Sequence, residues 1–257
     1  MPLKNLDDRQ LHEYLKRIHY GGPIEPINAV LVALQLAHLR TVPFENLDIH
    51  LKRPIVLDVE RLFDKIVHRN RGGFCYECNG LFTALLQTIG FNVTMLSAGV
   101  ARQSGGYSPD FDHMTLRVDL EEPWLVDVGF GDSFIQPLRL QKELEQFDGR
   151  KFFRFQENDG IWILEERDGE KPWMPQFRFS LKPREFPEYV PMCEYHQTSP
   201  ESTFTQKRVC SLLTESGRIT LSDWKLITTR DNKREERALN SQSEYDQTLR
   251  ELFSMIL

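Results

Sequence analysis

The sequence predicts an α+β fold in which helices come first and antiparallel strands follow. Apolar residues recur at helical spacing through most of the first ninety positions, and beyond Gly90 they recur at every second position. Clusters of glycine and proline separate the segments from one another. Many short alternating strands in one stretch favour a barrel or a strongly curved antiparallel sheet over a doubly wound one.

Four helices are predicted before Gly90. The first begins after Asp7 and Asp8, places Tyr14 and Ile18 on its apolar face, and ends at the glycines and proline of residues 21–23. A second, more buried helix covers residues 27–39, and a third covers residues 59–67. The fourth, at residues 75–89, carries an apolar stripe and ends before Gly90, which is a typical helix cap.

The middle of the chain reads as strands. Residues 113–120 alternate completely, with His113 and Arg117 on one face and Met114 and Leu116 on the other. Flanking strands are predicted at residues 93–100 and 124–128, and further strands at 151–156, 161–165 and 176–181.

The last quarter mixes both periods. Residues 183–200 are rich in proline and are predicted to form turns. Strands are expected at 207–214, 217–221 and 224–228, and the charged run 230–237 is interpreted as a solvated surface. A final amphipathic helix is predicted over residues 243–256.

Composition narrows the function classes. The chain has 257 residues, 40% of them hydrophobic, and a net charge of −6, so neither disorder nor a nucleic-acid partner is predicted. It has no apolar run of the roughly 20 residues that a membrane span needs. Four cysteines in a chain of this length are not a disulfide framework, which indicates a reducing, cytoplasmic compartment. The oligomeric state stays open.

The segment RGGFCYECN at residues 71–79 has the highest density of chemically suggestive residues. Two glycines precede the fourth predicted helix, and Cys75 lies in its first turn. The helix dipole and unpaired N–H groups favour a thiolate there, so Cys75 is a candidate nucleophile. The alternative is a structural role, in which Cys75 is a small buried cysteine that packs the start of the helix. Cys75 and Cys78 also form a C-x-x-C pair, but the surrounding helices disfavour a redox motif, and Cys193 and Cys210 lack zinc-ligand spacing.

A nucleophilic cysteine needs a base and an orienting carboxylate. His113 opens the best-defined strand just after a glycine-containing loop, and Asp127 lies in an apolar strand where a buried charge needs a partner. If the two strands form a tight hairpin, Asp127 falls opposite Arg117. The residues alone therefore leave two readings open: a Cys75–His113–Asp127 triad, or a cross-strand Arg117–Asp127 ion pair.

Five separated blocks resemble the arylamine N-acetyltransferases, in particular the bacterial type. They are VPFENL at 42–47, RGGFCYECN at 71–79, DHMTL at 112–116, LVDVGFG at 125–131 and SPESTF at 199–204. The blocks follow the order of the family, and the resemblance extends over nearly the whole chain. Together they are far more specific than any one of them.

The resemblance implies a three-part fold with a cysteine-protease-like Cys-His-Asp core. A helical bundle at residues 1–90 would carry the nucleophile, a β-barrel at 91–205 would carry the histidine and aspartate, and an α/β lid would occupy 206–257. Cys75, His113 and Asp127 would form the triad. A structural ion pair between Arg71 and Glu45 is expected beneath the nucleophile.

The resemblance also implies a ping-pong reaction with acetyl-CoA as co-substrate and no metal. Acetyl would pass through Cys75 to an arylamine, arylhydrazine or N-hydroxyarylamine, as in xenobiotic metabolism. Phe44 and Phe130 match positions that line the acceptor pocket. For CoA, the loop 104–110, Ser202 and Thr214 are candidates by position.

Three other readings compete with this one. The same triad could serve a hydrolase or transglutaminase-like enzyme, or an amide synthase that uses another acyl donor. A non-catalytic domain that binds zinc through its cysteines is the alternative from a different class. The physiological amine is not defined by the sequence.

Overall fold

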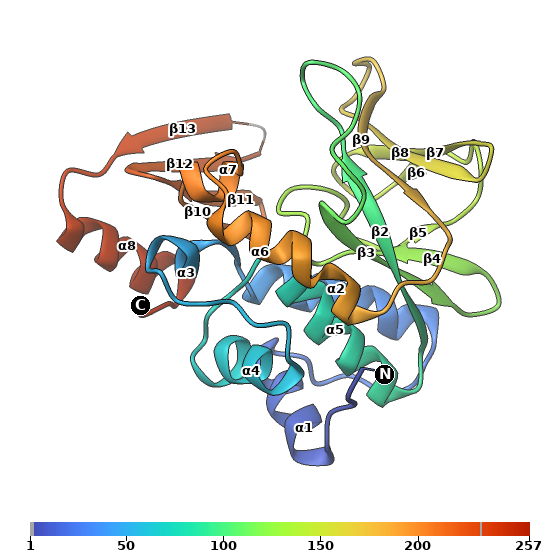
Figure 1. Ribbon diagram of the computed structural model, residues 1–257, viewed down its shortest axis with the longest axis horizontal. Helices are drawn as coiled ribbons and strands as arrows, with labels where there is room; N and C mark the ends of the chain where they lie inside the picture. Colours follow the sequence, from blue (N-terminus) through green and yellow to red (C-terminus); the bar gives the residue numbers. More distant parts are fainter. Residues whose placement is uncertain (1–2, 232) are drawn as a thin grey trace.

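The computed structural model describes residues 3–231 and 233–257, and it has the predicted α+β class. Figure 1 shows three groups of elements: helices, an eight-stranded antiparallel sheet, and a five-stranded sheet with the C-terminal helix. The long helix α5, Cys75–Ile89, and helix α6, Val190–Thr198, lie between the two sheets in this view.

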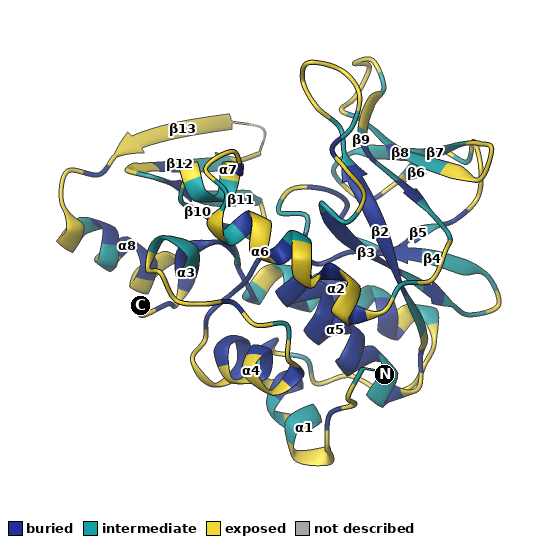
Figure 2. Ribbon diagram, in the orientation of Figure 1, coloured by how far each residue is buried: buried dark blue, intermediate teal, exposed yellow. Residues whose placement is uncertain are grey.

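The helical part contains the four predicted helices. The helices before residue 90 are α1 (Asp8–Arg17), α2 (Asn28–Thr41), α3 (Leu47–His50), α4 (Val59–Phe63) and α5. The predicted helix at 59–67 is present, but its second half widens into a π-helical turn, Asp64–His68. Helix α5 is almost entirely buried (Figure 2), so the other helices and the barrel pack around it.

The eight-stranded sheet is a nearly closed barrel with the order β5-β4-β3-β2-β9-β8-β7-β6. Gln146, at one edge, bonds both the backbone N–H and the carbonyl of Arg139, at the other edge, through its side-chain amide. Aromatic and aliphatic side chains fill the interior. The strands are β2 (Asn92–Val100), β3 (His113–Asp119), β4 (Pro123–Val126), β5 (Leu138–Arg139), β6 (Gln146–Phe147), β7 (Phe152–Asn158), β8 (Ile161–Arg167) and β9 (Met174–Ser180).

The five-stranded sheet joins one short strand from the N-terminal part of the chain to four strands from the C-terminal part. Its order is β1-β10-β11-β12-β13, and β1 (Phe44–Glu45) comes from the helical part. The fully buried Asn46 fastens this junction, because its side chain bonds the carbonyls of Phe204 and Lys207 and the N–H of Val209. The other elements are β10 (Val209–Thr214), β11 (Gly217–Ser222), β12 (Lys225–Arg230), β13 (Lys233–Ala238) and α8 (Gln242–Phe253).

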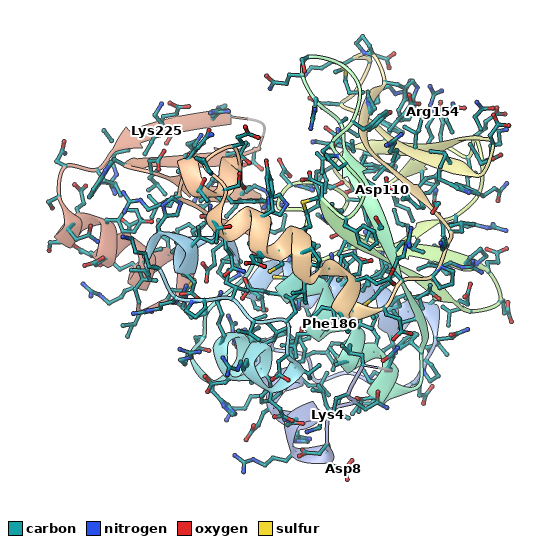
Figure 3. All side chains as sticks on the ribbon, viewed as in Figure 1. Lys4, Asp8, Asp110, Arg154, Phe186 and Lys225 are labelled. Atoms are coloured by element: carbon teal, nitrogen blue, oxygen red, sulfur yellow. The ribbon has the colours of Figure 1, made fainter. Side chains whose placement is uncertain are left out.

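The prediction of turns at residues 183–200 is wrong. A 3₁₀ turn, Phe186–Tyr189, leads into α6, and a short helix α7, Thr203–Gln206, follows. Pro187 and Pro191 lie in the first turns, where the missing N–H has no helical partner to lose. Phe186, labelled in Figure 3, belongs to the helical core.

Within the charged run at 230–237, residues 230, 231 and 233–237 are solvent-exposed as expected, and residue 232 lies outside the described residues. Part of the run is also a strand. Strand β13 pairs with β12 and forms the edge of the C-terminal sheet. All six of its residues are exposed, and five are charged (Figure 2). Charged side chains on both faces of an edge strand oppose pairing with another chain.

Candidate functional site

Cys75 is the first residue of α5, as predicted, and backbone contacts define the turn before it. Gly72 lies so close to the chain at Pro43 that an added Cβ would approach the Pro43 carbonyl oxygen to 1.8 Å. The N–H of Phe74 is capped by the side chain of Glu77, three residues into the helix. The double glycine is therefore required for α5 to begin beside β1.

His113 and Asp127 form a tight buried pair. The Nε2 atom of His113 lies 2.6 Å from Oδ2 of Asp127, and both side chains are at most 3% exposed. The imidazole packs edge-on against Phe130 and also contacts Phe177, which restricts its rotation. Because Nε2 faces the carboxylate, Nδ1 is the ring nitrogen left for a nucleophile.

The rival ion pair between Arg117 and Asp127 does not form. The register of β3 and β4 sets Arg117 opposite Leu125, so Asp127 continues the ladder toward Thr115 and the start of β3. Arg117 instead contacts Asp119, with 2.7 Å between its Nε and Oδ1. A register two residues away from the expected hairpin thus brings Asp127 to His113.

Asn79 is a residue of the candidate site that the sequence reasoning did not single out. It lies one helical turn after Cys75 and is fully buried. Its amide nitrogen donates to the carbonyl of Met114 and to Oδ1 of Asp127, and its oxygen accepts from the N–H of Val128. The i, i+4 spacing from Cys75 was the available signal, since such residues share one helix face.

The loop after Asp127 approaches α5 closely. Gly129 donates its N–H to Oδ1 of Asp127 at 2.8 Å. A Cβ at position 129 would lie 2.7 Å from the Cα of Cys75 and 2.9 Å from the amide nitrogen of Asn79. Only glycine allows this contact without displacement of the helix or the loop.

The pKa of the Cys75 thiol depends strongly on its burial. Burial raises its pKa well above the ordinary value, while the backbone N–H of Met114 acts in the opposite direction and the charge of Asp127 adds to the increase. An isolated thiolate is therefore disfavoured at this position. Deprotonation of Cys75 requires a proton acceptor nearby. His113 and His196 both line the same cavity and both contact a carboxylate, and His113 has the shorter contact, 2.6 Å to Asp127.

The cavity that contains Cys75 and His113 has a volume of about 890 Å³. Barrel strands, the loop before β3 and helices α6 and α7 contribute to its wall. Phe44, Phe130 and Phe204 supply aromatic surface, and Arg102 and Glu201 are exposed charged residues of the lining. Its size and mixed lining suit a small aromatic molecule together with part of a larger co-substrate.

The predicted acceptor and CoA residues separate into two groups. Phe44 and Phe130 both line the cavity, and Phe44 packs beside Phe204. Ser202 also lines it, but its hydroxyl accepts from the N–H of Phe204 at the start of α7. Thr214 ends β10 opposite Gly217, outside the residues that line this cavity. In the loop 104–110, Ser108 and Pro109 reach the cavity.

A buried charge cluster lies beneath the start of α5. The expected Arg71–Glu45 pair is confirmed, with guanidinium nitrogens 2.7 and 3.0 Å from one oxygen of Glu45. Asp48, Lys65 and Glu77 complete the cluster, because Lys65 lies 2.7 Å from Glu77 and 2.8 Å from Asp48. Burial raises the pKa of Glu77 to about 7 although Lys65 opposes this shift.

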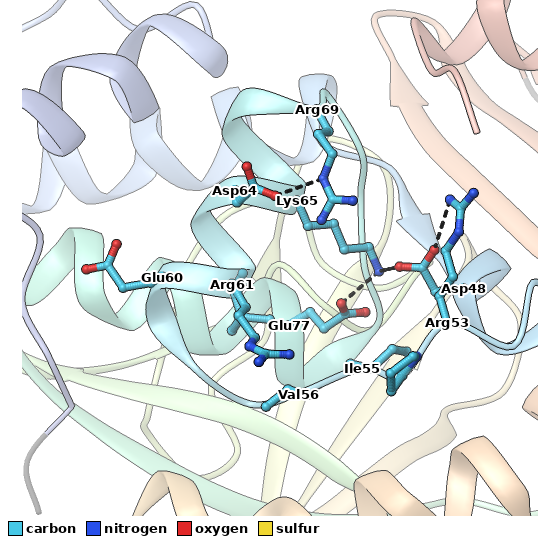
Figure 4. Close-up of a pocket in the computed structure, with 12 residues that line it drawn as sticks. Asp48, Arg53, Ile55, Val56, Glu60, Arg61, Asp64, Lys65, Arg69 and Glu77 are labelled. Carbon is cyan, nitrogen blue, oxygen red and sulfur yellow. Dashed lines mark hydrogen bonds and ion pairs between the residues drawn. The ribbon is translucent and has the colours of Figure 1, made fainter.

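A second cavity of about 540 Å³ opens onto this cluster. Figure 4 shows Lys65, Asp48 and Glu77 in contact on its inner side, with Arg53 and Arg61 also lining it. This cavity contains neither Cys75 nor His113. Of the five charged residues in the cluster, Asp48, Lys65 and Glu77 line this cavity.

The remaining cysteines are unpaired and buried. Cys78 directs its sulfur to the carbonyl of Gly73, while Cys193 and Cys210 belong to separate hydrophobic clusters. Across residues 3–231 and 233–257, no three His, Cys, Asp or Glu side chains converge in a metal-binding arrangement. Nor do these residues include a helix with the length and apolarity to cross a membrane.

Comparisons with known proteins agree with the geometry. The model of the N-acetyltransferase family matches residues 29–257. The chain is 35% identical to the pineal gland arylamine N-acetyltransferase isozyme NAT-3 of Gallus gallus, over 96% of this chain and 94% of that protein. It is 36% identical to an arylamine N-acetyltransferase / N-hydroxyarylamine O-acetyltransferase of Salmonella typhimurium, over 83% and 77% of the two chains.

Solved structures give the same relationship. The arylamine N-acetyltransferase from Salmonella typhimurium superposes with a TM-score of 0.90 at 32% identity and covers 96% of this chain and 91% of that one. The enzyme of Mycobacterium marinum in complex with CoA has a TM-score of 0.88 at 30% identity, with 95% and 92% covered. The chain therefore belongs to the arylamine N-acetyltransferase family of acyltransferases.

Proposed function

We propose that this protein transfers acetyl from acetyl-CoA to arylamines, arylhydrazines or N-hydroxyarylamines through an acetyl-Cys75 intermediate. The observation that carries the proposal is the 2.6 Å contact between His113 and Asp127 in the cavity that contains Cys75. Family membership supports the reaction class, and the names of the relatives support arylamines and N-hydroxyarylamines as acceptors. The Mycobacterium marinum complex supports CoA as the carrier.

In the first half-reaction, Nδ1 of His113 accepts the proton of the Cys75 thiol. The thiolate attacks the acetyl carbonyl, and Asp127 stabilises the imidazolium through its contact with Nε2. N–H groups in the first turn of α5 favour the oxyanion of the tetrahedral intermediate. The C–S bond to CoA then breaks, and CoA leaves as a thiol with the proton from His113.

In the second half-reaction, the acceptor nitrogen, or the hydroxyl oxygen of an N-hydroxyarylamine, attacks the Cys75 thioester. His113 accepts the proton from that atom, and Cys75 leaves as a thiolate, which restores the ion pair. Water competes with the amine, so the aromatic wall of Phe44, Phe130 and Phe204 favours transfer by excluding it. Phe44 and Phe130 would hold the acceptor ring, and Ser202 would lie near the CoA chain.

Of the two CoA-binding candidates, Thr214 has less support, because it does not line the cavity. It lies at the β10–β11 hairpin and would reach CoA only if the cofactor extended out of the cavity along that sheet. We place the enzyme in the cytoplasm, where a reducing environment keeps the four free cysteines reduced.

The decisive experiment is intact-mass measurement after mixing with acetyl-CoA and no acceptor. One added acetyl group is expected on the wild type and on Cys78→Ser, and none on Cys75→Ser. Cys78→Ser is the matched control, because this residue is equally buried and a hydroxyl can still donate to the Gly73 carbonyl. An unmodified wild type would exclude acetyl-CoA as the donor.

Acceptor dependence separates transfer from hydrolysis. An arylamine should discharge the acetyl enzyme much faster than buffer does, with N-acetylated product equal to the acetyl lost. Discharge at the same rate with and without the amine would favour the hydrolase reading. Transfer to protein amines alone would favour the transglutaminase-like one.

A further inference from the structure

We propose that His196 and Asp112 are a second histidine–carboxylate pair that positions the catalytic Cys75–His113 couple and sets the charge facing it. The inference deepens the proposed function and rests on it. His196 comes from α6, and Asp112 immediately precedes His113 at the start of β3. The pair thus joins a helix that covers the cavity to the residue before the catalytic base.

The imidazole of His196 is held in one orientation. It is 5% exposed, stacks on Tyr76 with 6.1 Å between ring centroids, and meets Phe74 and Phe204 edge-on. Its Nδ1 lies 3.1 Å from the hydroxyl of Ser202. A ring with this many neighbours cannot turn away from its partners without rearrangement of the cavity wall.

Asp112 is the charged partner of this ring. One carboxylate oxygen lies 3.3 Å from Nε2 of His196, an atom that solvent does not reach. Partial burial acts against the charge, but His196 and Ser108 more than compensate, so the pKa of Asp112 is lowered. Asp112 is therefore an anion throughout the neutral range, with its own side chain in the lining of the cavity.

A second link ties the same segment to the nucleophile helix. The hydroxyl of Tyr76, the residue after Cys75, donates to the carbonyl of Phe111 at 2.6 Å and approaches that of Asp112 at 3.3 Å. The stacked His196 and Tyr76 rings therefore hold both the backbone and the carboxylate of the segment before His113. These contacts link Cys75, Tyr76 and Asp112 to α6.

The sign of the electrostatic effect follows from the groups that face Asp112. These are Cys75 and His113 of the couple, the Tyr76 phenol, His196 and the Ser108 hydroxyl, with Arg102 and Glu201 more exposed in the same cavity. A negative charge raises the proton affinity of every neighbour, and the charge of Asp112 does so at Cys75. His196 reduces this effect by partly neutralising the carboxylate.

The test is the pH dependence of Cys75 alkylation by iodoacetamide, followed by intact mass in the absence of acetyl-CoA. Asp112→Asn should move the alkylation midpoint to lower pH by about 0.5 unit or more, because a unit charge in the same cavity is removed. His196→Phe keeps an aromatic ring but frees the charge of Asp112, so its midpoint should move to higher pH. Opposite shifts are the signature of the pair, and lost packing alone would not produce them.

His68→Phe is the matched control. His68 also contacts a carboxylate, Glu13, and packs edge-on against a phenylalanine, but it is exposed and lies outside the cavity. Its midpoint should equal that of the wild type. His196→Gln serves as a second variant if His196→Phe does not fold, and the same upward shift is expected from it.

Unchanged midpoints in Asp112→Asn, or shifts in the same direction for both partners, would overturn the inference. Failure of the proposed function is recognised separately, because the wild type would then not acquire acetyl from acetyl-CoA. Alkylation uses no acyl donor, so the two results are independent.

Discussion

Asn79 offers the sharpest test of how the site is held. Asn79→Ala removes three buried hydrogen bonds, those to Met114, Asp127 and Val128. Asp127 keeps its bond from Gly129, but the N–H of Val128 loses its side-chain acceptor. A buried donor without a partner costs about 1–3 kcal/mol, so the three losses together should lower the unfolding free energy by about 3 kcal/mol.

The effect on catalysis should exceed the effect on stability. Asp127 would lose one of the two donors that fix Oδ1, and a displacement of about 1 Å at a catalytic group costs on the order of 100-fold in rate. We therefore expect kcat to fall by that order, with the KM for the arylamine little changed, since Asn79 does not line the cavity. Urea unfolding and steady-state kinetics provide the two measurements.

Thr83→Ala is the matched control for this prediction. Thr83 is also buried on α5, one turn further on, and its hydroxyl bonds the carbonyl of Asn79 within the helix. It should lose about 1 kcal/mol of stability with no change in kcat. If Asn79→Ala lost stability but kept kcat within threefold of the wild type, its proposed role in orienting Asp127 would be wrong.

Three further predictions concern the base of α5. Gly129→Ala forces a Cβ to 2.7 Å from Cys75 and should cost about 1–3 kcal/mol, measured as a lower Tm, and slow acetyl-enzyme formation. The pKa of Glu77 is about 7 in the native state, whereas the unfolded chain releases this proton near the ordinary pKa of 4.5. Stability therefore falls by about 3 kcal/mol as pH rises through that window, and Glu77→Gln should lack this slope in urea titrations. Arg71→Leu leaves Glu45 with less compensation and should lower the unfolding free energy by about 3–5 kcal/mol.

The regular elements were predictable because apolar residues recur in the sequence with the period of a helix or of a strand. The stripe of α5 and the alternation of β3 each follow from one face being buried, and local spacing alone shows it. The prediction for residues 183–200 was wrong although the same kind of spacing is present there. Phe186, Tyr189, Cys193 and His196 are buried at helical spacing, but the prolines drew attention to turns.

The candidate site was predictable only in part from the residues themselves. Cys75 could be proposed from its position at a helix start, but the partner of Asp127 depended on a strand register. A shift of two residues decides between Arg117 and His113, and that shift follows from the position of the turn, since β3 ends at Asp119 and β4 begins at Pro123. The family resemblance supplied what the spacing left open.

Long-range partners were beyond the sequence. Asp112 and His196 come from segments separated by most of the barrel, and neither residue has a local pattern that points to the other. Lys65 was equally hidden, because its three carboxylate neighbours come from β1, α3 and α5. Such contacts follow from tertiary packing, which periodicity does not encode.

The union of β1 with β10 has a consequence for how the protein is made. Phe44 pairs with Ser211, and the bond from Val209 to Asn46 spans 163 residues. A ribosome that has completed the nucleophile helix and the barrel has therefore still not produced the strand against which Phe44 is fixed. Closing so long a loop is slow, so we expect the side of the cavity formed by Phe44 to assemble last. The growing chain thus carries its thiol before it has the closed cavity that directs the thiol toward an amine.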